Sequence, residues 1–308
     1  MMSNKTAVLL LAHGSPDSPA DVPEFIKYVT GGRPVPETTV EEIRHRYSLI
    51  GKSPLTEITM AQAKAMEREL GLPVYAGMRN WKPFISETTQ QMMDDGIEQL
   101  LAICLAPQNS STSVGLYKRA LFAAMKPEVS VQFVEEWHDH PLLVGAFAEK
   151  LEAAWQQANA ALGSPAPVIF TAHSVPTRTI QAGDPYEQET KETARLVGES
   201  IAGLTPELRQ FAFQSQGMSG GPWLGPTVER VILDLKKQGH KGVVVAPIGF
   251  VCDHVEVLYD IDIGFKQFAS EQEMILWRSE SLNTSPTFIS ALASLASEKL
   301  PVTSGRGA

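Results

Sequence analysis

The sequence has 308 residues, of which 43% are hydrophobic and 20% charged, and its formal net charge is −9. A chain of this length and composition is typical of a soluble globular protein and favours two domains. The negative charge argues against a nucleic-acid partner, because phosphate backbones attract basic surfaces. No apolar run reaches the roughly 18–20 residues of a membrane-spanning helix, so we expect no integral membrane segment. Two cysteines are too few for a disulfide framework and fit a reducing cytoplasm.

Apolar runs alternate with amphipathic stretches along almost the whole chain. In the first half we predict strands over 7–12, 72–80, 100–107 and 129–137, and helices over 40–51, 55–70, 85–99, 113–125 and 141–162. In the second half we predict strands over 167–172, 209–215, 241–250 and 273–279, and helices over 186–204, 226–239, 257–270 and 285–300. This alternation predicts parallel sheets with helices on both faces. We expect the tail, 302–308, to be disordered.

Two pairs of strand ends match between the halves. LAHGSP (11–16) resembles TAHSVP (171–176), and the Ala-Pro that ends one run at 106–107 recurs at 246–247. Two matches in the same order favour a duplicated α/β unit, although strand ends rich in small residues and proline are a simpler alternative. We therefore predict two similar Rossmann-like domains, 1–160 and 161–308, with a cleft between them and a closing helix in the second.

Polar residues follow several of the predicted strands. In a parallel sheet, ligands bind beyond the carboxyl ends of the strands, where His13 and His173 lie. The stretch FVCDHVEVLYD (250–260) follows another strand, and on a helix Glu256 and Asp260 would share one face. A neutral histidine facing carboxylates offers a proton acceptor near pH 7, a proton relay and ligands for a metal. The alternative is a helix start that attracts acids through its dipole.

Four motifs occur in a fixed order: FTAHSVP (170–176), GDPY (183–186), FQSQGMSGGPWLGP (213–226) and PIGFVCDHVEVLYD (247–260). Together they resemble the ferrochelatase family, lyases that insert Fe(II) into a porphyrin at the end of haem synthesis, and the similarity covers nearly the whole chain. The chain is most similar to the soluble Gram-positive type, whose substrate is coproporphyrin III. The resemblance implies a chelatase-type fold, Fe(II) and a porphyrin as substrates, no tightly bound cofactor and a cytoplasmic location. Two cysteines exclude the iron–sulfur cluster of some relatives.

The resemblance also implies roles for individual residues. His173 and Glu256 match the catalytic histidine and acid that together hold iron, and Asp260 matches an outer acid on the path of the metal. The region 16–54 would grip the porphyrin. The positions that would contact the porphyrin are His13, Arg46, Tyr47, Ser53 and Tyr117.

Four positions depart from the pattern of the soluble type. His13 stands where a tyrosine approaches the metal, Thr30 where an arginine meets a propionate, Asn80 where a histidine is expected and Gly264 where an outer acid is expected. Protoporphyrin IX therefore stays open as the substrate. A sirohydrochlorin-type cobalt or nickel chelatase and a non-catalytic porphyrin or haem carrier are the alternative functions. The sequence leaves the oligomeric state open, with a monomer among the options.

Overall fold

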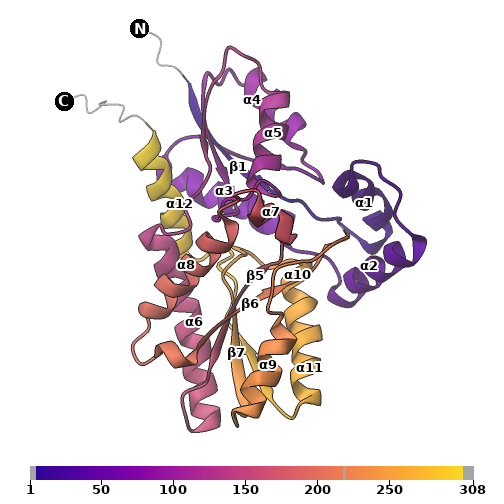
Figure 1. The fold of residues 1–308 in the computed structure, drawn as a ribbon. Coiled ribbons are helices and arrows are strands. Elements are labelled where there is room, and N and C mark those ends of the chain that lie inside the picture. Colours follow the sequence, from indigo (N-terminus) through magenta and orange to yellow (C-terminus); the bar gives the residue numbers. More distant parts are fainter. Residues whose placement is uncertain (1–4, 218–219, 301–308) are drawn as a thin grey trace, which may run out of the picture.

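A computed structural model describes residues 5–217 and 220–300 of the chain (Figure 1). The tail predicted to be disordered, 302–308, lies outside the described residues. All described strand pairs are parallel, and they form two four-stranded sheets. The first sheet contains β1 Thr6–Ala12, β2 Val74–Met78, β3 Gln99–Cys104 and β4 Ser130–Val134. The second contains β5 Val168–His173, β6 Arg209–Gln214, β7 Gly242–Pro247 and β8 Ile275–Arg278.

The two sheets share one topology. The strand order is β2-β1-β3-β4 in the first sheet and β6-β5-β7-β8 in the second, so β1 corresponds to β5 and β3 to β7. Every residue of β7 is buried, as expected for a parallel strand covered on both faces. The predicted α/β fold with two parallel sheets is confirmed, and the common strand order supports a duplicated unit.

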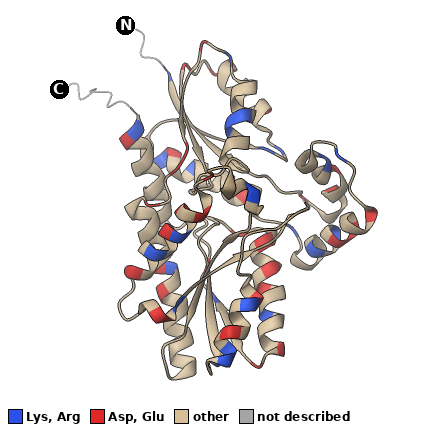
Figure 2. Cartoon of the chain, viewed as in Figure 1, with Lys and Arg blue, Asp and Glu red and all other residues tan. Residues whose placement is uncertain are grey.

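Helices flank both sheets and carry most of the charged residues, whereas the strands are almost uncharged (Figure 2). Within 5–162 they are η1 Pro19–Asp21, α1 Val22–Thr30, α2 Glu37–Ile50, α3 Leu55–Leu70, α4 Ile85–Asp94, α5 Val114–Ala124 and α6 Pro141–Leu162. From 163 to 300 they are α7 Thr177–Gln181, α8 Tyr186–Glu199, η2 Pro206–Leu208, α9 Val228–Lys237, α10 Val255–Leu258, the π-helical η3 Asp260–Phe265, α11 Lys266–Glu271 and α12 Pro286–Lys299. In the part of the chain that the structure describes, no helix has the length and apolarity to span a bilayer.

Several helices differ from their predictions: the one expected over 186–204 ends at Glu199, and α7 was not predicted. The helix expected over 85–99 ends at Asp94, because Gly96 turns the chain with a φ of 75°. The helix expected over 257–270 starts at Val255 and widens into η3 before α11. Helix α1 was not predicted, since prolines and glycines surround it, yet Val22 and Ile26 on one of its faces are buried against α2.

Two long helices connect the halves. Helix α6, which follows the first sheet, packs against α8, β7 and β8, whereas α12 at the end of the chain packs against α6 and α3. One contiguous hydrophobic cluster extends from Val8 to Ala296 as a result. The predicted division of the chain after residue 160 stays a prediction.

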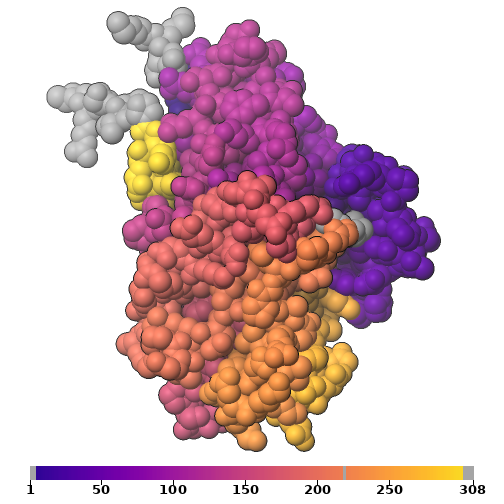
Figure 3. All heavy atoms as spheres, viewed as in Figure 1, coloured from indigo at the N-terminus to yellow at the C-terminus, as the bar shows by residue number. Residues whose placement is uncertain are grey.

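The carboxyl ends of the two sheets face each other. Gln108, beyond β3, donates from Nε2 to the carbonyl oxygen of Ile248, beyond β7, at 3.2 Å. The Ser111 backbone N–H donates to Asp184 at 2.7 Å, and that of Asn109 to Glu189 at 2.6 Å. Helices α1 and α2 lie to one side of this junction (Figures 1 and 3), and α2 contacts α10. The segments after the strands are therefore held near one another.

Gly249 allows the closest of these approaches. A Cβ at this position would lie 2.8 Å from both Cα and Cβ of Ala172, the residue before His173. We expect Gly249→Ala to lower the free energy of unfolding by about 1–3 kcal/mol in urea titrations, because backbone must move to admit the methyl group. The control is Gly145→Ala in α6, where a Cβ meets nothing within 4 Å. It should be neutral or stabilising by up to about 1 kcal/mol. Equal destabilisation of both variants would contradict this account.

Candidate active site

His173 and Glu256 come from the ends of neighbouring strands of the second sheet. His173 is the last residue of β5, and Glu256 lies in α10, beyond β7. The structure brings His173 Nε2 to 3.5 Å from Glu256 Oε1. The other ring nitrogen, Nδ1, is hydrogen-bonded to the Ser174 carbonyl oxygen, which orients the imidazole. The two side chains are 31% and 33% exposed, so both remain accessible from outside.

His173 and Glu256 each stabilise the charged form of the other. Burial alone lowers the pKa of His173, but the Glu256 carboxylate outweighs it and raises that pKa to about 9. Burial raises the pKa of Glu256, but His173 and His254 hold it well below its usual value. His254 Nε2 lies 3.6 Å from Glu256 Oε2, on the second carboxylate oxygen. At neutral pH the pair is therefore imidazolium and carboxylate, which differs from the neutral His173 expected from the sequence.

Asp260 lies beyond Glu256 and connects it to α2. Its carboxylate accepts a hydrogen bond from Ser215 Oγ, and Arg46 Nη1 lies 3.5 Å from Oδ1. Burial and the nearby Glu256 raise its pKa. The Arg46 guanidinium also lies over the Tyr259 ring, 5.2 Å from its centroid. Arg46 thus links the region 16–54 to the acidic residues of the second half.

His13 directly follows β1, and His173 is the last residue of the corresponding strand β5. Its Nδ1 lies 3.0 Å from the Gly14 carbonyl oxygen and its Nε2 lies 3.0 Å from Asn80 Nδ2. This arrangement assigns the ring proton to Nδ1, with Nε2 accepting from the amide. Desolvation, followed by the positive charge of Arg79, lowers the His13 pKa to about 4. His13 is therefore neutral at physiological pH, in contrast to His173.

The remaining predicted porphyrin contacts lie mostly within the protein. Tyr47 is buried, and its hydroxyl is 3.1 Å from Ser15 Oγ. Tyr117 is buried beneath the Arg79 guanidinium, which lies 5.8 Å from its ring centroid. The Ser53 hydroxyl is buried, and no described residue forms a hydrogen bond with it. In this structure Tyr47, Ser53 and Tyr117 thus lie in the walls beside the site, whereas His13 and Arg46 are more open.

Sequence reasoning missed two residues of this region, Ser215 and Arg79. Ser215 follows β6 and donates to Asp260, and Arg79 follows β2 and depresses the pKa of His13. Both occupy the position, directly after a parallel strand, that located His13 and His173. That positional signal was available for both residues.

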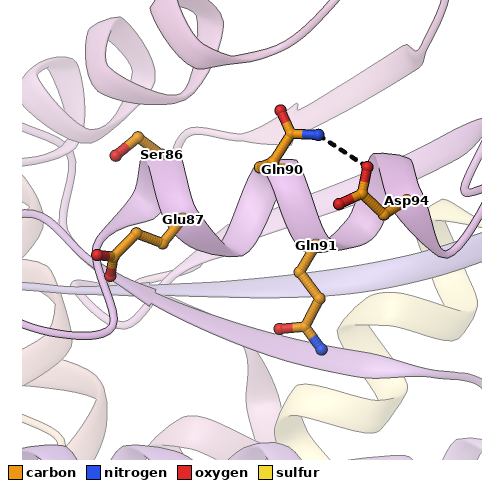
Figure 4. A pocket seen from close by; sticks show the side chains of 5 residues that line it. All are labelled: Ser86, Glu87, Gln90, Gln91 and Asp94. Carbon is orange, nitrogen blue, oxygen red and sulfur yellow. Dashed lines mark hydrogen bonds between the residues drawn. The ribbon is translucent and has the colours of Figure 1, made fainter.

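One shallow surface hollow lies away from these residues. Its lining residues, Ser86, Glu87, Gln90, Gln91 and Asp94, all belong to α4, where Gln90 Nε2 donates to Asp94 at 2.8 Å (Figure 4). None of them is a predicted site residue. Within the described residues, no group of three or more His, Cys, Asp or Glu side chains is arranged to hold a metal ion.

Comparisons with known proteins agree with the resemblance in sequence. A family model described as "Ferrochelatase" matches residues 5–300. The chain is 50% identical to a ferrochelatase of Acidobacterium capsulatum, over 97% of this chain and 96% of that protein. It is 37% identical to a coproporphyrin III ferrochelatase of Geobacillus thermodenitrificans, over 97% and 98%.

Solved structures agree with the fold. The sirohydrochlorin chelatase SirB from Bacillus subtilis subspecies spizizenii in complex with cobalt superposes with a TM-score of 0.59, over 96% of this chain and 94% of that one. The sequence identity is 11%, so this likeness concerns the fold alone. The match over 5–300 and the extent of identity to the curated relatives are decisive for family. The chain belongs to the ferrochelatase family, the lyase-class metal chelatases of haem biosynthesis that insert iron into a porphyrin.

Proposed function

We propose that the chain inserts Fe(II) into coproporphyrin III and that His173 and Glu256 carry out the insertion. The observation that carries the proposal is the approach of the imidazole to the carboxylate, 3.5 Å apart and both accessible. The preference for coproporphyrin III draws on relatives named for that substrate at 35–37% identity. Protoporphyrin IX is the competing substrate, and the assay below separates the two.

The porphyrin itself sets the requirements of the reaction. A flat ring presents its N–H groups in the ring plane, so a metal ion cannot enter without distortion of the macrocycle. Binding energy from the periphery of the ring would supply that distortion. The proposed contacts for this grip are Arg46, Tyr47, Ser53 and Tyr117, with His13 facing the ring from the side opposite to His173.

Each insertion releases two pyrrole protons, and their acceptor must be basic when the metal arrives. His173 is held as an imidazolium by the Glu256 carboxylate. Approach of Fe(II) to Glu256 would offset the carboxylate charge and lower the His173 pKa, so that Nε2 releases its proton to water. The neutral imidazole then accepts the two pyrrole protons one after the other, and Asp260, whose pKa is raised, passes each of them on to water. Two N–H bonds break as the iron–nitrogen bonds form, so the charge balances.

Delivery of the metal requires weak binding. A closed site of four protein ligands would retain the ion, whereas Glu256 and His173 offer an open pair. We propose that Fe(II) is a substrate at this pair and that the enzyme needs no tightly bound cofactor. His13, neutral and held by Asn80, would contact the iron of the product from the other face. A cytoplasmic location is part of the same proposal.

The two alternative functions have less support. The sirohydrochlorin chelatases share the fold with this chain at 11–13% identity, well below its identity to the ferrochelatases. A porphyrin or haem carrier would have no use for an imidazolium–carboxylate pair that cycles protons. Turnover of more than one equivalent of porphyrin would separate an enzyme from a carrier.

His173→Ala should lower the turnover number for iron insertion by about 10²–10⁴-fold, because the proton acceptor is lost. Porphyrin affinity, measured by fluorescence quenching without metal, should change little. His240→Ala, beyond α9, serves as the control and should retain full activity. An active His173→Ala enzyme would overturn the assignment.

The two opposed histidines should titrate far apart. NMR titration of the ligand-free protein should place the His173 pKa near 9 and the His13 pKa near 4. Glu256→Gln removes the negative charge that raises the His173 pKa, so that pKa should fall to 6.5 or below. Because its folded-state pKa is raised, His173 contributes stability that is complete below pH 6.5 and is lost as the pH rises through 9. A wild-type His173 that titrates near 6.5 would refute the pairing.

The purified protein, mixed anaerobically with Fe(II) and a porphyrin, should shift the absorption bands of many equivalents of porphyrin. Coproporphyrin III should react with a higher kcat/KM than protoporphyrin IX. A shift that stops at one equivalent would indicate a carrier. A preference for protoporphyrin IX would contradict the proposed substrate.

A further inference from the structure

Arg79 is a partly buried guanidinium without an acidic partner. It follows β2, and its Nε is buried with no hydrogen-bond partner among residues 5–217 and 220–300. Among the ion pairs of the described residues, none includes Arg79. Arg278 provides the contrast, because its guanidinium lies 3.4 Å from Asp253 and 2.9 Å from Asp262. A charge of this kind is costly to bury unless an anion or hydrogen-bond acceptors satisfy it.

The surroundings of Arg79 add positive charge instead of neutralising it. Burial lowers the pKa of Arg79, Tyr117 raises it, and the positive charge of Arg119, on α5, lowers it further, so a second cation lies in the neighbourhood. Arg119 is exposed and forms no ion pair among the described residues. The Arg79 guanidinium lies over Tyr117, and its charge lowers the pKa of His13. This unpaired positive charge is therefore located between two of the proposed porphyrin contacts.

We propose that Arg79, supported by Arg119, binds a carboxylate of the porphyrin, an inference that rests on the proposed function. A carboxylate accepts two parallel hydrogen bonds from a guanidinium, which would neutralise the unpaired charge of Arg79 and offset the repulsion from Arg119. Coproporphyrin III carries a propionate on every pyrrole ring, whereas protoporphyrin IX has vinyl groups on two of them. The arginine pair thus acts on substrate orientation and specificity, and the proton transfer remains with His173.

The test measures equilibrium binding of metal-free coproporphyrin III and of its methyl ester, which lacks the negative charges, in the same detergent. Arg79→Gln should weaken binding of the free acid about 10–100-fold, the usual effect of losing a charge-assisted hydrogen bond. Binding of the ester should stay at the wild-type level. Arg79→Lys should recover part of the loss, and Arg119→Gln should weaken the free acid less. Arg230→Gln, on the exposed face of α9, controls for removal of a positive charge.

Equal losses for acid and ester would show that Arg79 supports the wall of the site, and unchanged binding of the acid would show that it contacts no carboxylate. Either result overturns the inference while leaving iron insertion by the wild-type protein intact. Failure of the wild type to bind either porphyrin would instead reject the proposed function. If Arg79→Gln does not fold, as judged by thermal melting, Arg119→Gln provides the same acid-to-ester comparison.

Discussion

The site depends on two sheets whose carboxyl ends face each other. Gln108 donates across the junction to Ile248, and Asp184 accepts from Ser111. Residues that follow parallel strands lie outside the hydrogen-bonded sheet. Their side chains are therefore available at this junction to bind a ligand. A duplicated unit with its copies arranged end to end brings one histidine from each copy to that region.

The two histidines show how a common position acquires two different charges. Glu256 holds His173 as an imidazolium, whereas His13 has only an amide and a carbonyl as hydrogen-bond partners and a guanidinium nearby. The corresponding strands β1 and β5 place the two histidines, and residues from other segments determine whether each histidine is protonated. Under the proposed function, the pair would treat the two faces of the porphyrin differently, with proton transfer on one side and a neutral nitrogen on the other.

The strands and the α/β class could be predicted because the spacing of apolar residues and the residue types of each segment are local properties of the sequence. The motifs around His173 and Glu256 likewise located both residues. The protonation state of His173 could not be predicted, since it depends on how closely the imidazole approaches the Glu256 carboxylate, a distance of 3.5 Å that the sequence does not give. Arg79 could have been noted from its position after a strand, but its lack of an acidic partner among the described residues is visible only in three dimensions. Helix α1 was obscured by the prolines and glycines around it.

Each half of the chain packs against a long helix from the other half, and this affects how the protein folds during its synthesis. Helix α3, made early, is covered by α12, which is the last described helix to be made, and Gln62 on α3 donates to the carbonyl oxygen of Asn283. The amino-terminal half therefore cannot complete its hydrophobic core on the ribosome until the segment 286–299 has emerged. Although the chain consists of two similar units, it matures as one, and a nascent chain that stalls short of α12 would leave apolar surface exposed to chaperones and proteases.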